Sequence, residues 1–128
     1  MRTALTLAAA AALALSLTAP AQAETTRYSL TVQGAPEQQG DGAIGWARSM
    51  ELECGPAGGG HPRADEACEL IEAAGGSIAD VQAVRDGACT MIHRPVTAIA
   101  VDGDGERYEE TFGNDCLLSM AKGAIFDF

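Results

Sequence analysis

Four cysteines, Cys54, Cys68, Cys89 and Cys116, carry the most evident chemistry in this chain of 128 residues. An even number of cysteines can form two disulfides in an oxidising compartment, and three pairings are possible. A zinc site would require short spacers such as C-x-x-C, and the spacers here are much longer. With two disulfides formed, no cysteine would be left as a catalytic thiol. The cysteines therefore predict two structural disulfides and no metal site.

A short segment that begins at Cys89 is the candidate functional site. It reads Cys-Thr-Met-Ile-His-Arg-Pro, so that Met91 and Ile92 lie between a cysteine and Pro95. A disulfide would fix one end, and the proline favours extended backbone before it. Such a stiff segment suits a protease cleft, which binds extended backbone and takes one side chain into a pocket. The competing interpretation buries Met91 and Ile92 at the start of a strand, because apolar residues usually belong to the core.

The two histidines do not indicate catalysis. His61 precedes an expected helix, where an exposed or capping role is typical, and His93 is expected to lie exposed in the candidate segment. A small hydrolase would need a nucleophile beside one of these histidines, with further groups gathered around a cleft. We therefore expect a protein that is not an enzyme and that uses no cofactor.

Five strands are predicted, and the first two of them show alternating apolar and polar residues. The turn Asp102-Gly103-Asp104-Gly105 is expected to join two of them as a hairpin. It does not match an EF-hand calcium loop, because Arg107 stands where that loop requires glycine. The predicted strands comprise residues 28–32, 50–54 (with Trp46 near the start), 96–101, 106–112 and 125–128.

Two helices are expected before the candidate segment. The first begins near Pro62 and ends at Gly75-Gly76, with Cys68 on its apolar face, from which it can meet Cys54 of a neighbouring strand. The second follows a capping-box-like start at Ser77 and runs to about Arg85. Together with the strands, these helices predict a single α+β domain with a mainly antiparallel sheet.

Residues 1–23 have the pattern of a signal peptide, which leaves residues 24–128 as the domain. An apolar run from Ala4 to Leu17 is followed by the small-residue cleavage motif Ala21-Gln22-Ala23. The run is shorter than a membrane-spanning helix requires. The formal net charge of −10 argues against binding to nucleic acid or to anionic membranes. We expect a secreted, extracellular protein.

The order and spacing of several short motifs resemble the Streptomyces subtilisin inhibitor family, which comprises secreted inhibitors of serine proteases. The similarity extends over essentially the whole of residues 24–128. The matching motifs are Leu52-Glu53-Cys54-Gly55-Pro56, His61-Pro62, Ala67-Cys68-Glu69-Leu70, Ala74-Gly75-Gly76, Cys89-Thr90-Met91-Ile92, Pro95-Val96, Val101-Asp102-Gly103, Gly113-Asn114-Asp115-Cys116 and Phe126-Asp127-Phe128.

The resemblance implies a disulfide pairing and a reactive bond. The pairs are Cys54–Cys68 and Cys89–Cys116, and the reactive bond is Met91–Ile92. Met91 is then the P1 residue that fills the S1 pocket of a subtilisin-like or chymotrypsin-like protease. The remaining assignments place Cys89 at P3, Thr90 at P2, His93 at P2′, Arg94 and Pro95 at the end of the loop, and Asn114 as the side chain whose amide supports the loop.

The resemblance also implies a fold of five antiparallel strands and two helices that forms a homodimer by packing sheet to sheet. The sequence departs from the family at two loop positions, where the family often has proline at Thr90 and aspartate at Arg94. An alternative function is a secreted structural or ligand-binding module that keeps the scaffold without inhibiting a protease. That alternative predicts that Met91 and Ile92 are buried.

Overall fold

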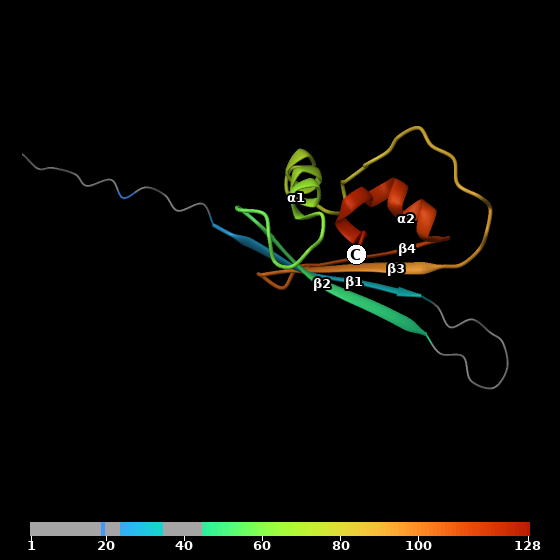
Figure 1. Ribbon diagram of the computed structural model, residues 1–128, viewed down its shortest axis with the longest axis horizontal. Helices are drawn as coiled ribbons and strands as arrows, with labels where there is room; N and C mark the ends of the chain where they lie inside the picture. The colour runs from blue at the N-terminus through green and yellow to red at the C-terminus, as the bar shows by residue number, and fades with distance from the viewer. Residues whose placement is uncertain (1–18, 20–23, 35–44) are drawn as a thin grey trace, which may run out of the picture.

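The computed structural model describes residue 19 and residues 24–34 and 45–128. The predicted signal peptide, apart from residue 19, lies outside the described residues. In the described part, one sheet lies beneath two α-helices, and the segment that joins α1 to β3 arches over one end of the molecule (Figure 1). Among the described helices, none is both long and apolar enough to cross a membrane.

The sheet contains four antiparallel strands in the order β2-β1-β3-β4. These strands are β1 (Thr26–Gly34), β2 (Trp46–Cys54), β3 (Val96–Asp102) and β4 (Arg107–Phe112). All four overlap predicted strands, and β1 shows the alternation of buried and exposed residues that its sequence predicts. Leu30, Val32 and Leu52 are completely buried on the helix side.

The predicted fifth strand at residues 125–128 is wrong. Residues Gly123–Phe126 instead form a short 3-10 helix, η1, in the described structure. Ala124, Ile125 and Phe126 are buried one after another. A half-covered strand would turn alternate residues to solvent, whereas a tight helical turn wedged between the sheet and the helices can bury all three.

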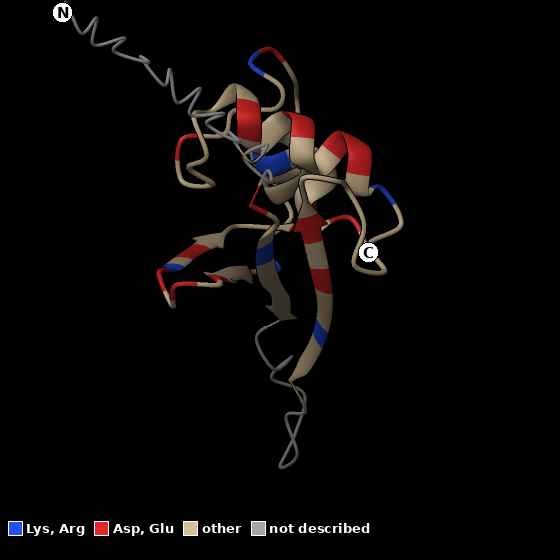
Figure 2. Ribbon diagram, turned by 90° about the vertical axis from the view of Figure 1, so that its left-hand side faces the viewer, with Lys and Arg blue, Asp and Glu red and all other residues tan. Residues whose placement is uncertain are grey.

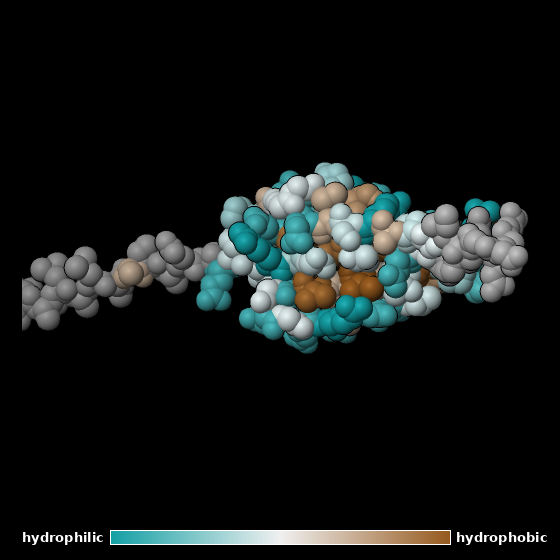
Figure 3. Space-filling model, turned by 90° about the horizontal axis from the view of Figure 1, so that it is seen from below, coloured by the Kyte–Doolittle hydropathy of each residue, from teal (hydrophilic) through white to brown (hydrophobic). Residues whose placement is uncertain are grey.

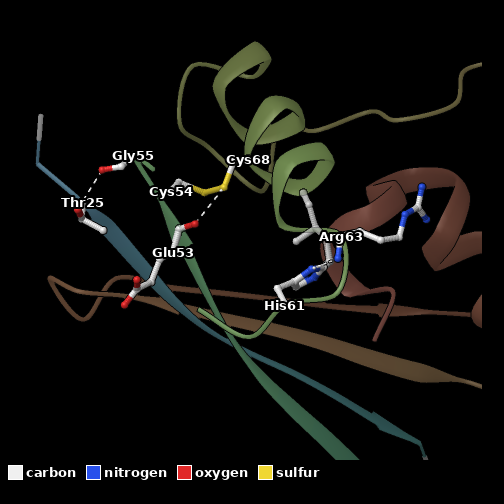
Figure 4. Close-up of a disulfide and its surroundings, with 8 residues drawn as sticks. Thr25, Glu53, Cys54, Gly55, His61, Arg63 and Cys68 are labelled. Atoms are coloured by element: carbon white, nitrogen blue, oxygen red, sulfur yellow. Dashed lines mark hydrogen bonds between the residues drawn. A yellow bond between two sulfur atoms is a disulfide. The ribbon is translucent and has the colours of Figure 1, made fainter. Parts of the chain in front are cut away.

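The first helix, α1 (Ala64–Ala73), lies within the predicted range. It starts two residues after Pro62 and ends before Gly75 and Gly76, which both have positive φ. The Cys54–Cys68 disulfide joins the end of β2 to α1, with 5.5 Å between the Cα atoms (Figure 4). This pair confirms the pairing that the resemblance implied. The exposed side of α1 carries a row of acidic residues (Figure 2).

The predicted second helix at residues 77–85 is also wrong. This segment forms turns, and its backbone amides at Ala83 and Val84 donate to the carbonyls of Ala121 and Met120. Hydrogen bonds to another element have replaced the local ones that a helix would make. The second helix is instead α2 (Asp115–Lys122), which begins directly after Asn114.

His61 is buried rather than exposed. Its Nδ1 accepts a hydrogen bond from the amide of Arg63, the residue before α1, at 3.0 Å, as Figure 4 shows, but the N-terminus of α1 has no side-chain cap. Its Nε2 then carries the proton and donates to the carbonyl of Ile125 at 2.9 Å. Because both ring nitrogens are engaged in structural hydrogen bonds, His61 cannot serve as the base of a hydrolase.

Candidate functional site

The segment between residues 85 and 95 has no regular secondary structure and projects beside α2 (Figure 1). Met91 is 98% exposed and Ile92 is 56% exposed. Strand β3 starts at Val96, immediately after Pro95. The interpretation that Met91 and Ile92 are core residues is therefore wrong. The alternative of a structural or ligand-binding module predicted that both residues are buried, and that prediction is wrong too.

The Cys89–Cys116 disulfide fastens the beginning of this loop to the first turn of α2. The two Cα atoms are 5.8 Å apart. This second pair completes the pairing that the resemblance implied, and among the described residues no cysteine is free. With all four thiols in disulfides, the zinc interpretation of the cysteines is excluded. The loop is thus anchored two residues before Met91.

The side chain of Asn114 connects the two sides of the loop at Met91. The Asn114 side chain is buried, and its Nδ2 donates to the carbonyl oxygens of Thr90 at 3.2 Å and Ile92 at 2.8 Å. Its Oδ1 accepts from the amide of Leu117 at 2.9 Å and caps the start of α2. The side-chain amide of Asn114 therefore binds one carbonyl on each side of Met91. The hydrogen bond to the start of α2 fixes the position of that amide.

The other end of the loop is attached to the end of β4. The amide of Arg94 donates to the carbonyl of Gly113 at 2.9 Å. Two residues later, Val96 pairs with Phe112 in the β3–β4 register. The loop backbone is therefore fixed on the prime side of the Met91–Ile92 bond as well as on the other side.

Two contacts beneath the loop were not foreseen from the sequence. The Sδ of Met120 lies 3.1 Å from the Sγ of Cys89. A Cβ added to Gly87 would lie 2.6 Å from the Cε of Met120, so glycine allows the chain to pass close to α2 here. No local pattern signals such contacts, because they join residues from α2 to a loop far earlier in the chain.

The exposed charged residues of the loop have both signs. Arg85, His93 and Arg94 are exposed on the loop, and so is Asp86 next to Arg85. The rest of the molecule carries most of the acidic side chains, which give the full chain its charge of −10. The loop therefore presents an apolar side chain, Met91, with charged residues of both signs on its flanks.

Comparison with protein families identifies the scaffold. A sequence model of the subtilisin inhibitor-like family matches residues 25–114, which is well over half of the chain. The chain belongs to this family. Subtilisin inhibitor-like proteins are protease inhibitors and not enzymes, and the chain is accordingly not an enzyme.

Two curated relatives from Streptomyces illustrate the similarity. The chain is 40% identical over 97 residues to the transglutaminase-activating metalloprotease inhibitor of Streptomyces mobaraensis, a match that covers 70% of this chain and 66% of that protein. It is 40% identical over 85 residues to subtilisin inhibitor-like protein 5 of Streptomyces fradiae, covering 63% and 79% of the two chains.

A solved structure extends the comparison to three dimensions. The fold matches that of Streptomyces caespitosus sermetstatin in its complex with Bacillus licheniformis subtilisin, with a TM-score of 0.56 and 26% sequence identity. The match covers 79% of this chain and 99% of the other. In that solved structure, the matched protein is bound to a subtilisin.

Proposed function

We propose that the protein inhibits subtilisin-like serine proteases by a substrate-like mechanism, with Met91–Ile92 as the reactive bond. The observation that carries the proposal is the 98% exposure of Met91 at the crest of a loop that is anchored on both sides. An apolar side chain is left in water while the backbone on each side of it is held by Asn114. Exposure of this apolar side chain to water is unfavourable in the free protein. Its burial in the S1 pocket of a protease is favourable and contributes to binding.

The loop enters the cleft as extended backbone, with Met91 in the S1 pocket. Thr90 occupies P2, Cys89 occupies P3 and His93 occupies P2′. Because the disulfide and the Asn114 amide hold the loop in the free protein, little conformational entropy is lost on binding. Thr90 is β-branched and stiff, so the extended geometry survives without the proline that the family often has there.

The same anchors oppose hydrolysis after the serine of the protease attacks. Cleavage leaves the carbonyl carbon of Met91 on the enzyme as an ester and Ile92 as a new amine. Asn114 still holds the carbonyls of Thr90 and Ile92, so the amine stays beside the ester. Re-formation of the peptide bond is then effectively intramolecular and outcompetes attack by water.

The P1 side chain sets the range of target enzymes. Met91 is apolar, unbranched and flexible, which suits the apolar pockets of subtilisin-like and chymotrypsin-like proteases. A trypsin-like pocket contains a buried carboxylate and requires lysine or arginine. The protein should therefore discriminate strongly against trypsin.

Titration of subtilisin and trypsin with the purified protein tests the proposal directly. We expect stoichiometric loss of subtilisin activity and weak inhibition of trypsin. Incubation with catalytic subtilisin at mildly acidic pH should produce slow cleavage at Met91–Ile92, which mass spectrometry locates. Equal potency against both enzymes, or cleavage at another bond, would contradict the assignment.

The substitution Asn114→Asp should make the protein a better substrate and a weaker inhibitor of subtilisin. The aspartate keeps an oxygen for the amide of Leu117 but loses both donors to the loop. Each lost hydrogen bond has a net value of about 1 kcal/mol, so we expect the cleavage rate by subtilisin to rise on the order of tenfold or more. The rate is measured as loss of intact protein over time.

The matched control is Asn114→Ala, which removes the helix cap together with the loop contacts. It should lower the free energy of unfolding by a further 1 kcal/mol or so, the typical loss for a cap. If Asn114→Asp resists cleavage as well as the unchanged protein does, Asn114 does not support the loop.

We further propose that the protein is secreted and that residues 1–23 are removed as a signal peptide. The support comes from the apolar run, the small-residue cleavage motif and two disulfides, which form in oxidising compartments. The functional protein then consists of residues 24–128.

We also propose a homodimer that packs sheet to sheet. On the face of the sheet away from the helices, a small apolar patch lies among hydrophilic residues (Figure 3). By strand alternation this face carries Ile99 and half-buried Val101 of β3, next to the hydroxyl pair Thr31–Ser49. Light scattering should give the mass of a dimer, and Val101→Glu should reduce it to that of a monomer. A monomeric mass for the unchanged protein would contradict this proposal.

A further inference from the structure

Lys122 is the most deeply buried charged side chain among the described residues, with 3% of its surface exposed. It is the last residue of α2, at the opposite end of that helix from Asn114. A buried ammonium group that lacks partners is strongly destabilising. The buried ammonium group of Lys122 therefore needs hydrogen-bond acceptors that replace its hydration.

Three backbone carbonyls supply those acceptors. The Nζ of Lys122 donates to the carbonyl oxygens of Ile78 at 2.8 Å, Ala79 at 2.9 Å and Val81 at 3.0 Å. An ammonium group has three protons, so every donor has a partner. The nitrogen also lies 5.1 Å from the ring centroid of Tyr108. Burial lowers the pKa of Lys122, while the carboxylates of Glu110 and Asp80 oppose this shift.

These carbonyls belong to the arm, the stretch of chain that leads into the loop of residues 89–95, which is called the inhibitory loop below. The arm, residues 77–88, forms turns and bends but no helix or strand. Beyond Val81, the amides of Ala83 and Val84 donate to carbonyls near the end of α2, at 3.0 and 2.9 Å. The disulfide and Asn114 then follow near the start of the same helix. The arm thus runs antiparallel to α2 and is hydrogen-bonded to it between Ile78 and Val84, before the disulfide at Cys89.

We propose that Lys122 is a positioning residue of the inhibitory loop, which fixes the path of the arm by binding the carbonyls of Ile78, Ala79 and Val81. This inference rests on the proposed function. After cleavage, the acyl group on the protease belongs to Met91, at the end of the arm, whereas the amine of Ile92 is attached to β3. Re-formation of the bond requires the two ends to stay in register, so a loosened arm favours hydrolysis.

The test compares Lys122→Met with the unchanged protein in two measurements. The first is the rate at which catalytic subtilisin cleaves Met91–Ile92. We expect an increase on the order of tenfold, because even a 1 Å misplacement of reacting groups can cost about a hundredfold in rate. The second is hydrogen exchange at the amides of Thr90 and Met91 in the free protein, which should become faster by a similar factor.

A stability control separates positioning from general weakening. Leu52→Val removes a methylene from a completely buried residue on β2, the edge strand farthest from β4. It should lower the melting temperature and leave both the cleavage rate and the loop exchange unchanged. The variant Lys122→Arg retains the charge and several donors, and it should return both rates towards those of the unchanged protein.

The outcomes distinguish this inference from the proposed function. If Lys122→Met does not fold, Lys122→Gln, whose amide can satisfy only two of the three carbonyls, replaces it and should also raise both rates. If the unchanged protein fails to inhibit subtilisin, the proposed function fails, and faster loop exchange in the Lys122 variants still supports the positioning role. If the Lys122 variants and Leu52→Val have the same loop exchange and cleavage rates at matched stability, Lys122 has no such role.

Discussion

Replacement of Met91 by lysine should convert the protein into an inhibitor of trypsin. The lysine ammonium would meet the buried carboxylate of the trypsin S1 pocket, and loss of one partner from such a pair costs about 2 to 5 kcal/mol. We therefore expect the inhibition constant for trypsin to improve by roughly a hundredfold or more. Potency against subtilisin should fall by a smaller factor, because the apolar stem of lysine still fits an apolar pocket.

Because Met91 is exposed, this substitution should change the specificity of inhibition without changing the stability of the fold. A side chain that is 98% exposed contributes little to folding, so Met91→Lys should change the free energy of unfolding by less than about 0.5 kcal/mol. Met91→Leu is the matched control, since it keeps an apolar P1 residue of similar size and should preserve inhibition of subtilisin. If Met91→Lys alters the inhibition of neither enzyme, Met91 is not the P1 residue.

Removal of the Cys89–Cys116 disulfide should have the second large effect. The double substitution Cys89→Ser with Cys116→Ser opens a loop that joins residues 27 positions apart. In the chain-entropy view this lowers the free energy of unfolding by about 3.6 kcal/mol. It also frees the loop on the acyl side of the reactive bond, so subtilisin should cleave Met91–Ile92 rapidly instead of being inhibited. Urea unfolding and mass spectrometry of protease-treated protein measure the two effects.

The other disulfide supplies a control of nearly equal energy. Cys54→Ser with Cys68→Ser opens a loop with a separation of 14 positions, which predicts a loss of about 3 kcal/mol. This bridge lies between β2 and α1, away from the loop. Molecules of this variant that remain folded should still inhibit subtilisin. If both double variants resist cleavage equally, the disulfide at Cys89 serves stability alone.

The elements that the sequence predicted well are those with a strong local period. Strand β1 alternates between buried and exposed residues, and this period of two can be recognised in its sequence. Helix α1 has an apolar stripe and ends before two glycines, which also signals its position locally. Residue types at close spacing, Cys89 to Pro95, marked the candidate segment, but they did not predict that Met91 and Ile92 are exposed.

The elements that were predicted wrongly have structures set by distant residues. Residues 77–85 have a helix-like start, but Lys122 and the last carbonyls of α2 take up their backbone hydrogen bonds. Residues 125–128 look like a strand, but the space between the sheet and the helices accommodates a short helical turn, Gly123–Phe126. Helix α2 did carry a local signal, since Asn114 is a favourable N-cap followed by an acidic residue.

The sequence by itself determined the cysteine framework, the alternating strands and the chemistry of the loop, because these depend on residue type and short-range spacing. The tertiary structure decided that Met91 is exposed, that Asn114 bridges the carbonyls on both sides of it and that Lys122 binds three carbonyls of the arm. Each of these features joins residues far apart in the chain. Hydrogen bonding and burial between distant segments arise when the chain packs, and no local pattern encodes them.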